Sequence, residues 1–349
     1  MAETDYNSLM NKLRWGILGC ARIAEKALVP AIRESSNGVL YGIASRNPRR
    51  AAEWAARHGF ERSYRSYQDL LDDPAIDAVY NPLPNDLHAP WSVLAARAGK
   101  HVLCEKPLAL NAVEARRMFG AASRTRVLLM EAFMYRFHPQ FEIVQALVGS
   151  GEVGEPRVVR ASFTFPYDGL PDDYRWSTAH GGGALYDVGC YTINAARTVF
   201  GAEPVRCFCA GRLHPRRRID LTVGLILEFP RGRLAILDCS YETQFQSELA
   251  VVGREGRITL DRAFSAKQFD VEVRIRKGDE ERAVFVHRTD QYRLMVEHFG
   301  RAVLEGFPLR LTPRDAFGNM AVLDAAFASL RTGRPVRVSH SLRPWSLTG

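Results

Sequence analysis

Short runs of consecutive apolar residues alternate with helical segments over the first 130 residues of the chain. Such runs are typical of parallel strands that are buried on both faces. We expect a first helix that ends near Arg33, further helices at 48–58, 66–71, 90–98 and 111–123, and strands at 13–18, 39–44, 76–80, 101–104 and 127–130. Right-handed crossovers between these strands give a doubly wound parallel sheet. Residues 12–135 are therefore predicted to form an α/β Rossmann domain.

The pattern changes after about residue 150, where several segments alternate apolar and polar residues, as strands with one covered face do. A strong helix is expected at 184–200, after three glycines, and two more at 292–305 and 313–330. The expected strands lie at 157–165, 205–210, 221–229, 233–239, 247–252, 257–260, 269–276 and 283–286. Residues 136–340 are predicted to form an α+β domain with a large, mainly antiparallel, open-faced sheet.

The composition favours a soluble two-domain protein of 349 residues, with 46% hydrophobic and 25% charged residues. No apolar run reaches the roughly 18 residues that a membrane span needs, and the N-terminus lacks the basic and apolar regions of a secretory signal. We therefore expect a cytoplasmic protein with no membrane partner. The formal net charge is +8, but the arginines are scattered and form a triplet only at 216–218, so nucleic-acid binding is not expected.

Six cysteines are present, and none are spaced as C-x-x-C. Cys207 and Cys209 are two apart in a predicted strand, so both point to one face. Their neighbours are mostly apolar. We expect buried, reduced thiols and no metal site.

The segment that joins the first strand to the first helix has the order of a phosphate-binding turn. It fits G-x-G-x-x-G only loosely, with alanine at the second and third glycine positions, and a plain strand-to-helix turn is the alternative. A small-residue turn lets the backbone approach a pyrophosphate at the helix N-terminus. The candidate residues are Gly19, Cys20, Ala21, Arg22 and Ile23.

The end of the second strand indicates which dinucleotide binds. NAD enzymes usually place a carboxylate there, to hold the ribose 2′-hydroxyl. This chain has Ser45 and Arg46 instead, with Arg50 behind them. A carboxylate would repel a 2′-phosphate, whereas serine and arginine would bind it. We predict NADP(H) in preference to NAD(H), which stays possible because Arg46 could also be an ordinary surface residue.

Lys106 lies directly after the strand at 101–104, at the carboxyl edge of a parallel sheet, where ligands bind. Together with other motifs, the segment around Lys106 resembles the glucose-fructose oxidoreductase/inositol dehydrogenase (Gfo/Idh/MocA) family. The resemblance runs from Leu13 to about Val338. It rests on GILGCARIA, NPLPNDLHAPW, AGKHVLCEKPLAL, MEAFMYRFHPQ and GGGALYDVGCYTINAAR, which start at residues 16, 81, 98, 130 and 181.

The resemblance implies that Lys106 is the catalytic lysine, Tyr191 the acid/base and Asp187 its companion on the same helix. Asp187 and Tyr191 are four residues apart and so share a helix face. Free tyrosine has a pKa of about 10, and a nearby ammonium group stabilises the phenolate. We therefore expect Lys106 to lower the pKa of Tyr191 and to donate a hydrogen bond to the reacting oxygen.

The resemblance also implies contacts around these three residues. Cofactor contacts are expected from Pro82, Leu83, Asn85, His88, Glu105, Lys106, Arg175 and Trp176, although His88 is as easily a helix cap and Trp176 an interdomain packing residue. The substrate cleft is expected to include Lys106, Phe133, Met134, Tyr135, Arg136, Asp187 and Tyr191, with Phe165, Tyr167 and Tyr241 as apolar walls.

The predicted function is an NADP(H)-dependent oxidoreductase that acts on a secondary alcohol, ketone or anomeric carbon of a sugar or cyclic polyol. The branch that it resembles also contains nucleotide-sugar 3-ketoreductases and trans-dihydrodiol dehydrogenases, and these remain alternatives. Arg136, Arg212 or the triplet at 216–218 could serve a nucleotide-linked substrate. A non-catalytic sensor of NADP or sugar is the alternative of a different class. The resemblance implies that the open outer face of the antiparallel sheet pairs with another subunit, and an exposed apolar sheet face would otherwise be unfavourable, so we expect a homodimer or homotetramer.

Overall fold

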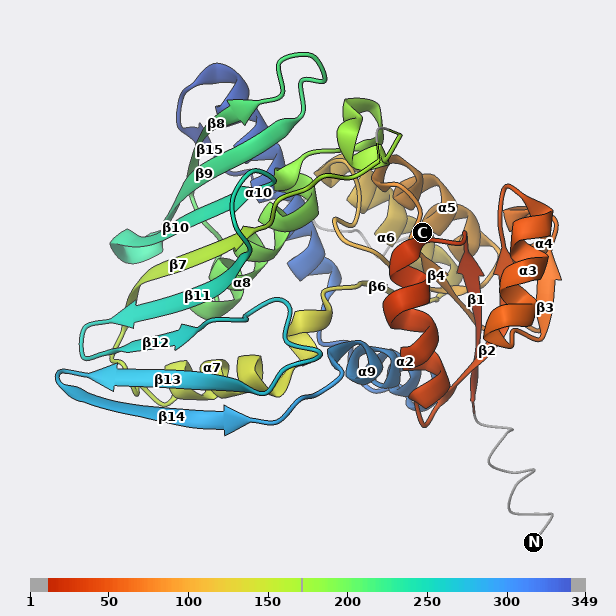
Figure 1. The fold of residues 1–349 in the computed structure, drawn as a ribbon, viewed down its shortest axis with the longest axis horizontal. Coiled ribbons are helices and arrows are strands. Elements are labelled where there is room, and N and C mark those ends of the chain that lie inside the picture. The colour runs from red at the N-terminus through yellow and green to blue at the C-terminus, as the bar shows by residue number, and fades with distance from the viewer. Residues whose placement is uncertain (1–11, 171, 340–349) are drawn as a thin grey trace, which may run out of the picture.

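The computed structural model describes residues 12–170 and 172–339. They form two units side by side, one built on a parallel sheet and one on a mainly antiparallel sheet (Figure 1). The predicted fold class is confirmed. Residues 1–11, where no export signal is expected, lie outside the described residues.

The N-terminal sheet has six parallel strands in the order β3-β2-β1-β4-β5-β6. The strand order reverses between β1 and β4, and open sheets of this kind bind ligands at that point, outside the carboxyl ends of the strands. Strand β3 was not expected, because it is a short edge strand with polar, exposed residues. The strands are β1 (Leu13–Leu18), β2 (Gly38–Ala44), β3 (Arg62–Tyr64), β4 (Ala78–Asn81), β5 (His101–Cys104) and β6 (Leu129–Glu131).

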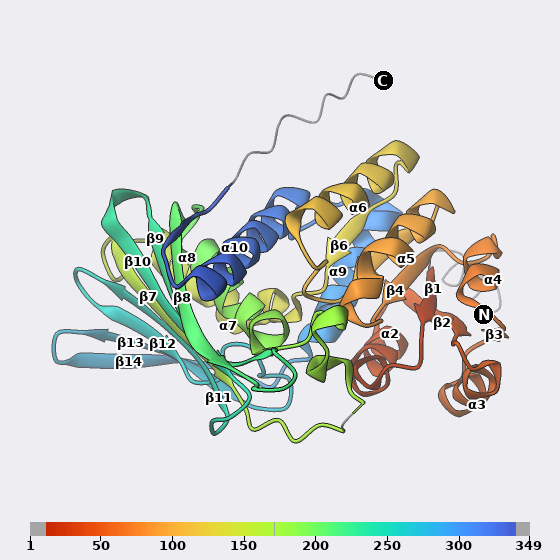
Figure 2. The same cartoon turned by 90° about the horizontal axis from the view of Figure 1, so that it is seen from above.

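Helices cover both faces of this sheet. Figure 2 shows α5 and α6 on one side and α2 on the other. Helix α9 (Gln291–Glu305), from the C-terminal part of the chain, packs beside α2 (Figure 1). The rings of Trp15 on β1 and Phe299 on α9 lie 5.4 Å apart, so α9 completes the core of the N-terminal unit. The other helices here are α2 (Val29–Glu34), α3 (Pro48–His58), α4 (Tyr67–Asp72), α5 (Asn85–Arg97) and α6 (Ala112–Thr125).

Helix α5 differs from the prediction at its start. The sequence predicted a start at Pro90, but the helix begins at Asn85 and Pro90 lies inside it. The side chain of Pro90 is exposed, so its ring displaces no core residue. The earlier start brings Asn85 and His88 into the first turns of the helix, beside the carboxyl end of β4.

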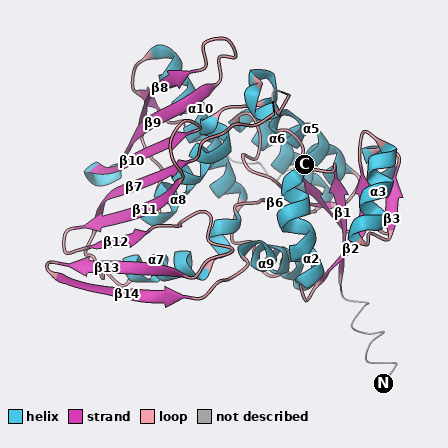
Figure 3. Ribbon diagram, viewed as in Figure 1, coloured by secondary structure: helices cyan, strands magenta, loops and turns pink. Residues whose placement is uncertain are grey.

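The C-terminal sheet has nine strands in the order β14-β13-β12-β11-β7-β10-β9-β8-β15 (Figure 3). The pair β7–β10 is parallel, and the other described pairs are antiparallel. The strands are β7 (Pro156–Thr164), β8 (Arg206–Leu213), β9 (Asp220–Phe229), β10 (Arg233–Ser240), β11 (Gln246–Gly253), β12 (Arg257–Leu260), β13 (Val271–Lys277), β14 (Glu280–Val286) and β15 (Val336–Arg337).

Three helices cover the face of this sheet that is turned toward the N-terminal unit (Figure 2). They are α7 (Pro139–Gly149), α8 (Cys190–Phe200) and α10 (Pro313–Thr332). Helix α7 was not predicted. Cys207 and Cys209 are buried between the sheet and these helices, and Cys104, Cys190 and Cys239 are buried as well. Cys20 departs from the expectation of buried thiols, because it is half-buried in the turn after β1. Among the described residues, no helix is long and apolar enough to cross a membrane.

The start of the helix at 184–200 is fixed by a buried carboxylate on the sheet. A π-helical turn (Leu185–Gly189) leads into α8, and Asp220 on β9 accepts a hydrogen bond from Leu185 N at 2.5 Å. Gly183 has a φ of +112°, and a Cβ there would clash with the Asp220 carboxylate. Burial raises the pKa of Asp220 to about 6. The close approach therefore requires glycine, and it sets the position of Asp187 and Tyr191.

Candidate active site

The carboxyl ends of β1, β2, β4 and β5 meet at one edge of the N-terminal sheet. They are followed by Gly19, Ser45, Pro82 and Glu105, respectively. The sequence-predicted cofactor residues of the N-terminal unit therefore gather at the point where the strand order reverses.

The turn after β1 has the backbone of a phosphate-binding loop. Gly19 has a φ of +92°, and a Cβ at this position would lie 2.9 Å from Leu83 Cδ2. The chain becomes helical at Arg22, directly after the small-residue turn, and no side-chain hydrogen bond caps this end, a position where a helix N-terminus favours an anion. Arg50 Nη2 donates to the carbonyl oxygen of Cys20 at 3.0 Å. The space that glycine leaves and the uncapped helix fit a dinucleotide pyrophosphate.

The end of β2 carries hydroxyl and guanidinium groups and no carboxylate. Ser45 is buried, and its Oγ accepts a hydrogen bond from Asn47 N at 3.3 Å. Asn47 caps α3 through the amides of Arg49 and Arg50. Arg46 is exposed, and no carboxylate of the described residues pairs with it. The end of β2 therefore offers a hydroxyl group and an exposed guanidinium group, and lacks the carboxylate that holds a ribose 2′-hydroxyl in NAD enzymes.

Lys106 is held by the carboxylate of Asp187. Its Nζ donates to Asp187 Oδ1 at 3.0 Å and to the Asp187 carbonyl oxygen at 2.7 Å. The second carboxylate oxygen of Asp187 accepts from Arg175 Nε at 2.9 Å and lies 3.0 Å from the hydroxyl of Tyr241. Tyr241 was expected as an apolar wall, but its hydroxyl group is part of this hydrogen-bond network.

The electrostatics of this network keep all its charges in place. Burial alone would raise the pKa of Asp187, but Arg175 and Lys106 outweigh it and lower that pKa well below its usual range. Burial alone would lower the pKa of Lys106, but Asp187 and the weaker contributions of Cys190, Tyr174 and Glu105 together outweigh burial, so the pKa is raised. Lys106 is therefore a cation at neutral pH, able to donate a hydrogen bond to a ligand oxygen.

Tyr191 lies next to Lys106, but its hydroxyl does not meet the ammonium group. Lys106 Nζ is 5.1 Å from the centre of the Tyr191 ring, and the Tyr191 hydroxyl donates to Met134 Sδ at 3.4 Å. Burial raises the pKa of Tyr191 well above its usual value. The expectation that Lys106 lowers this pKa is wrong for this structure, because the ammonium lies over the ring face and is already neutralised by Asp187.

The ring of Tyr191 is enclosed by aromatic side chains from strand β7, the 3-10 turn at Met134–Phe137 and two loops. Its edge-to-face neighbours are Phe133 at 5.2 Å and Phe163 at 5.3 Å between ring centres, and Tyr135 and Phe264 lie within 6 Å. These contacts fix the orientation of the phenol. A fixed orientation is what proton transfer to a bound substrate requires.

A narrow cavity of about 110 Å³ opens between the two units beside Lys106 and Tyr191. Two of its residues, Tyr174 and Tyr292, were not singled out in the sequence. Tyr174 is adjacent to the predicted Arg175, whereas nothing in the local sequence around Tyr292 marks it as a site residue. The lining residues are Ile23, Pro82, Leu83, Asn85, His88, Glu105, Lys106, Tyr174, Arg175, Tyr191 and Tyr292.

Several predicted residues do not line this cavity. Arg136 is buried and bonds to Asn194 Oδ1 at 3.2 Å, with Asp315 at 3.6 Å. Trp176 packs on Tyr167, with 5.3 Å between ring centres. Met134 does not line the cavity either, and its Sδ accepts the hydrogen bond of the Tyr191 hydroxyl group. Arg212 is paired with Glu242.

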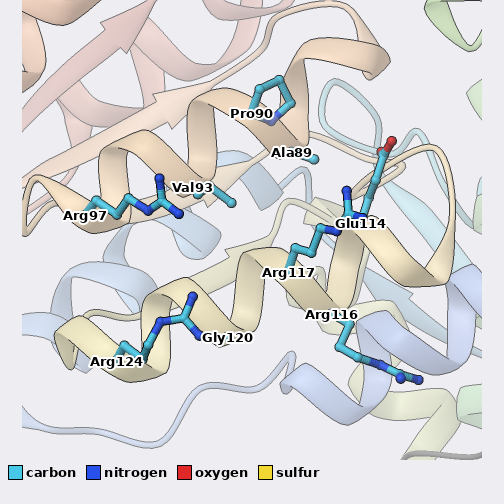
Figure 4. Close-up of a pocket in the computed structure, with 9 residues that line it drawn as sticks. All are labelled: Ala89, Pro90, Val93, Arg97, Glu114, Arg116, Arg117, Gly120 and Arg124. Atoms are coloured by element: carbon cyan, nitrogen blue, oxygen red, sulfur yellow. The ribbon is translucent and has the colours of Figure 1, made fainter.

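A wider groove, of about 510 Å³, lies elsewhere, between α5 and α6 (Figure 4). Arginines at 97, 117 and 124 border it, and Arg97 and Arg124 lie in the last turns of their helices, where a cation offsets the helix dipole. It contains no residue of the Lys106 network. The cavity at Lys106 is therefore the candidate active site. The described residues contain no His, Cys, Asp and Glu group that could hold a metal ion.

Comparison with known proteins identifies both units. Residues 13–133 match the model described as "Oxidoreductase family, NAD-binding Rossmann fold", and residues 141–259 match "GFO/IDH/MocA C-terminal domain". An uncharacterised oxidoreductase of Rhizobium meliloti is 40% identical, covering 93% of this chain and 98% of the relative. A D-xylose 1-dehydrogenase (NADP(+)) of Haloferax volcanii is 37% identical, covering 93% of this chain and all of that protein.

The similarity extends to solved structures. The crystal structure of a 3-ketoreductase from Actinomadura kijaniata in complex with NADP and TDP-benzene superimposes with a TM-score of 0.86. The two sequences are 34% identical, and the match covers 92% of this chain and 98% of that chain.

Replacement of Asp187 by asparagine tests the buried ion pairs. The substitution removes the charge that Lys106 and Arg175 share, and breaking a buried pair in this way costs about 3 kcal/mol or more. The pKa of Asp187 is lowered by folding, so its stabilisation is present above the unfolded value of about 4 and is lost as pH falls through the folded pKa. Denaturation by urea should show a large loss of stability for Asp187→Asn at pH 7 and a smaller one at pH 3.5. Equal stabilities at pH 7 would contradict this account.

Proposed function

The chain belongs to the GFO/IDH/MocA family of oxidoreductases, and from this we propose that it transfers a hydride between NADP(H) and a secondary alcohol, ketone or anomeric carbon of a free sugar or cyclic polyol. Relatives of this chain are NAD(P)-dependent dehydrogenases and reductases that act on CH–OH groups. The observation that carries the proposal is the buried Lys106–Asp187 pair beside Tyr191, in a cavity at the strand-order reversal.

The residues present fit the cofactor. The turn from Gly19 to Ile23 would hold the pyrophosphate, and Ser45 and Arg46 the 2′-phosphate. Pro82, Leu83, Asn85 and Glu105 would lie beside the nicotinamide. NADP(H), when bound, supplies or accepts the hydride.

Lys106 and Tyr191 divide the remaining chemistry between them. The ammonium of Lys106 donates a hydrogen bond to the substrate oxygen and stabilises the negative charge that develops there. Tyr191 keeps its proton at neutral pH and donates it to that oxygen during reduction, after which the phenolate regains a proton from water. In oxidation Tyr191 first releases its proton to water, and the phenolate then takes the hydroxyl proton of the substrate. Asp187 fixes the ammonium and does not take the proton, because its pKa is lowered.

A free sugar or polyol fits better than a nucleotide-linked sugar. Two of the candidate basic contacts for a nucleotide diphosphate are engaged elsewhere, Arg136 by Asn194 and Asp315 and Arg212 by Glu242, which leaves the exposed triplet at 216–218. A nucleotide-sugar 3-ketoreductase and a trans-dihydrodiol dehydrogenase are the enzymatic alternatives, since such enzymes are among the relatives.

The substitutions Lys106→Met and Tyr191→Phe test the proposed roles. Each should lower kcat by about a hundredfold or more, as loss of an acid/base group does, while NADPH affinity measured by tryptophan fluorescence stays within about threefold. The assay is a panel of aldoses, cyclic polyols, a dTDP-linked ketosugar and a trans-dihydrodiol. A wild-type protein that binds NADPH and turns over none of them would favour the non-catalytic sensor.

Cofactor choice is tested by separate titrations with NADPH and NADH. NADPH should bind at least about tenfold tighter, a difference of roughly 1.4 kcal/mol, and Arg46→Ala should remove most of that difference. Arg57→Ala, on the far end of α3, is the matched control and should leave it unchanged. NADH binding as tightly as NADPH would refute the role given to Ser45 and Arg46.

We also propose a homodimer or homotetramer through the uncovered face of the C-terminal sheet. Phe208, Ile226 and Ile236 are neighbours across β8, β9 and β10 and point outward. Their exposed fractions are 36%, 43% and 44%, high for large apolar side chains. The double substitution Ile226→Glu/Ile236→Glu should convert a dimer or larger species to monomer in sedimentation velocity at about 10 µM. Leu304→Glu, an exposed apolar site on α9, should not. A monomeric wild type would end this proposal.

A further inference from the structure

The imidazole of His88 joins the two loops that border the cavity. His88 is almost fully buried on α5. Its Nδ1 lies 2.8 Å from the carbonyl oxygen of Pro107, and its Nε2 lies 2.8 Å from the carbonyl oxygen of Leu83. Leu83 follows β4, and Pro107 is the residue after Lys106. One ring therefore connects the loop beside the cofactor site with the loop that carries the lysine.

We propose that His88 is the positioning residue of Lys106 and that it acts by donating a hydrogen bond from Nδ1–H to Pro107. This inference rests on the role proposed for Lys106. Neither the sequence analysis nor the relatives assign it, since a helix cap or a ligand contact was the expectation. The cap of α5 is at Pro84, and the two ring nitrogens of His88 are directed at protein carbonyl groups.

Only one of the two ring contacts is a hydrogen bond at neutral pH. Burial lowers the pKa of His88 to about 4, and a neutral imidazole has one N–H group. The side chains that influence it most are the buried ammonium of Lys106 and the carboxylate of Asp86. The tautomer therefore decides which loop is held.

The surroundings favour the bond to Pro107. Proline has no amide N–H, so its carbonyl group is the only main-chain polar group through which Pro107 can be held. The Leu83 loop has a second attachment, because Leu83 N donates to Asn81 Oδ1 at 3.3 Å. An unpaired buried carbonyl group carries a similar desolvation cost at either residue, but Pro107, unlike Leu83, has no amide group that could hold it in place.

The residues around Lys106 fix it from both ends. Asp187 holds the ammonium group, Glu105 Oε2 accepts from Lys106 N at 3.3 Å, and Glu131 Oε1 accepts from Leu108 N at 2.8 Å. His88 supplies the remaining contact, on Pro107, between these two backbone attachments. A shift of about 1 Å in a reacting group can lower the rate by about a hundredfold, so the loss of this contact is expected to affect kcat.

The test compares His88→Asn with His138→Asn in the full chain. His138 is also buried, but its ring caps α7 and does not contact the Lys106 loop, and asparagine is a good helix cap. With the best substrate of the panel and saturating NADPH, His88→Asn should lower kcat about tenfold or more. His138→Asn should leave kcat within about twofold. A kcat for His88→Asn within twofold of wild type would overturn the inference.

A second measurement does not depend on the variant folding. The wild-type protein, labelled with ¹⁵N at its nine histidines, should show His88 as a neutral ring protonated at Nδ1, with a slowly exchanging N–H signal at pH 7. The Nε2–H tautomer, or a rapidly exchanging ring, would sink the inference. A Lys106→Met variant that keeps full activity would instead contradict the proposed function, which separates the two failures.

Discussion

The organisation of the site depends on one buried carboxylate. Asp187 accepts from Lys106 with one oxygen and from Arg175 with the other, so it connects the loop after β5, the segment before the three glycines and the helix that carries Tyr191. Without it, two cations would share a poorly solvated space between the units. The side chain of Lys106 is only 12% exposed, and desolvation alone would favour the neutral amine. The Asp187 carboxylate keeps Lys106 charged.

The position of Asp187 is itself set by the fold of the C-terminal unit. The π-helical turn at Leu185–Gly189 starts where Asp220 on β9 receives the Leu185 amide, and Gly183 allows the chain to pass against that carboxylate. The C-terminal sheet therefore has a role in the site in addition to packing against its helices. It holds the helix from which Asp187 reaches the edge of the other sheet, and so it determines where the substrate is presented to the cofactor edge.

Much of this arrangement was predictable from local sequence. Buried strands gave the doubly wound unit, because consecutive apolar residues need cover on both faces, and Lys106 was identified by its place after β5. The side-chain contacts that define the site were harder to predict from the sequence. The polar role of Tyr241 and the place of Tyr292 in the cavity depend on segments that are far apart in the sequence. The spacing of Asp187 and Tyr191 predicted a shared face, but it could not show that Lys106 meets the Tyr191 ring and not its hydroxyl.

That last difference bears on the chemistry. A phenol close to an uncompensated ammonium group would ionise more easily, whereas here Asp187 already neutralises the ammonium and aromatic rings surround the phenol. Tyr191 therefore holds its proton, and a proton donor is what the reduction of a carbonyl group needs. In the mechanism proposed above, oxidation requires the reverse transfer, to a Tyr191 that has first lost its proton. The ion pair keeps the lysine charged, so the proposed proton carrier is Tyr191 and not Lys106.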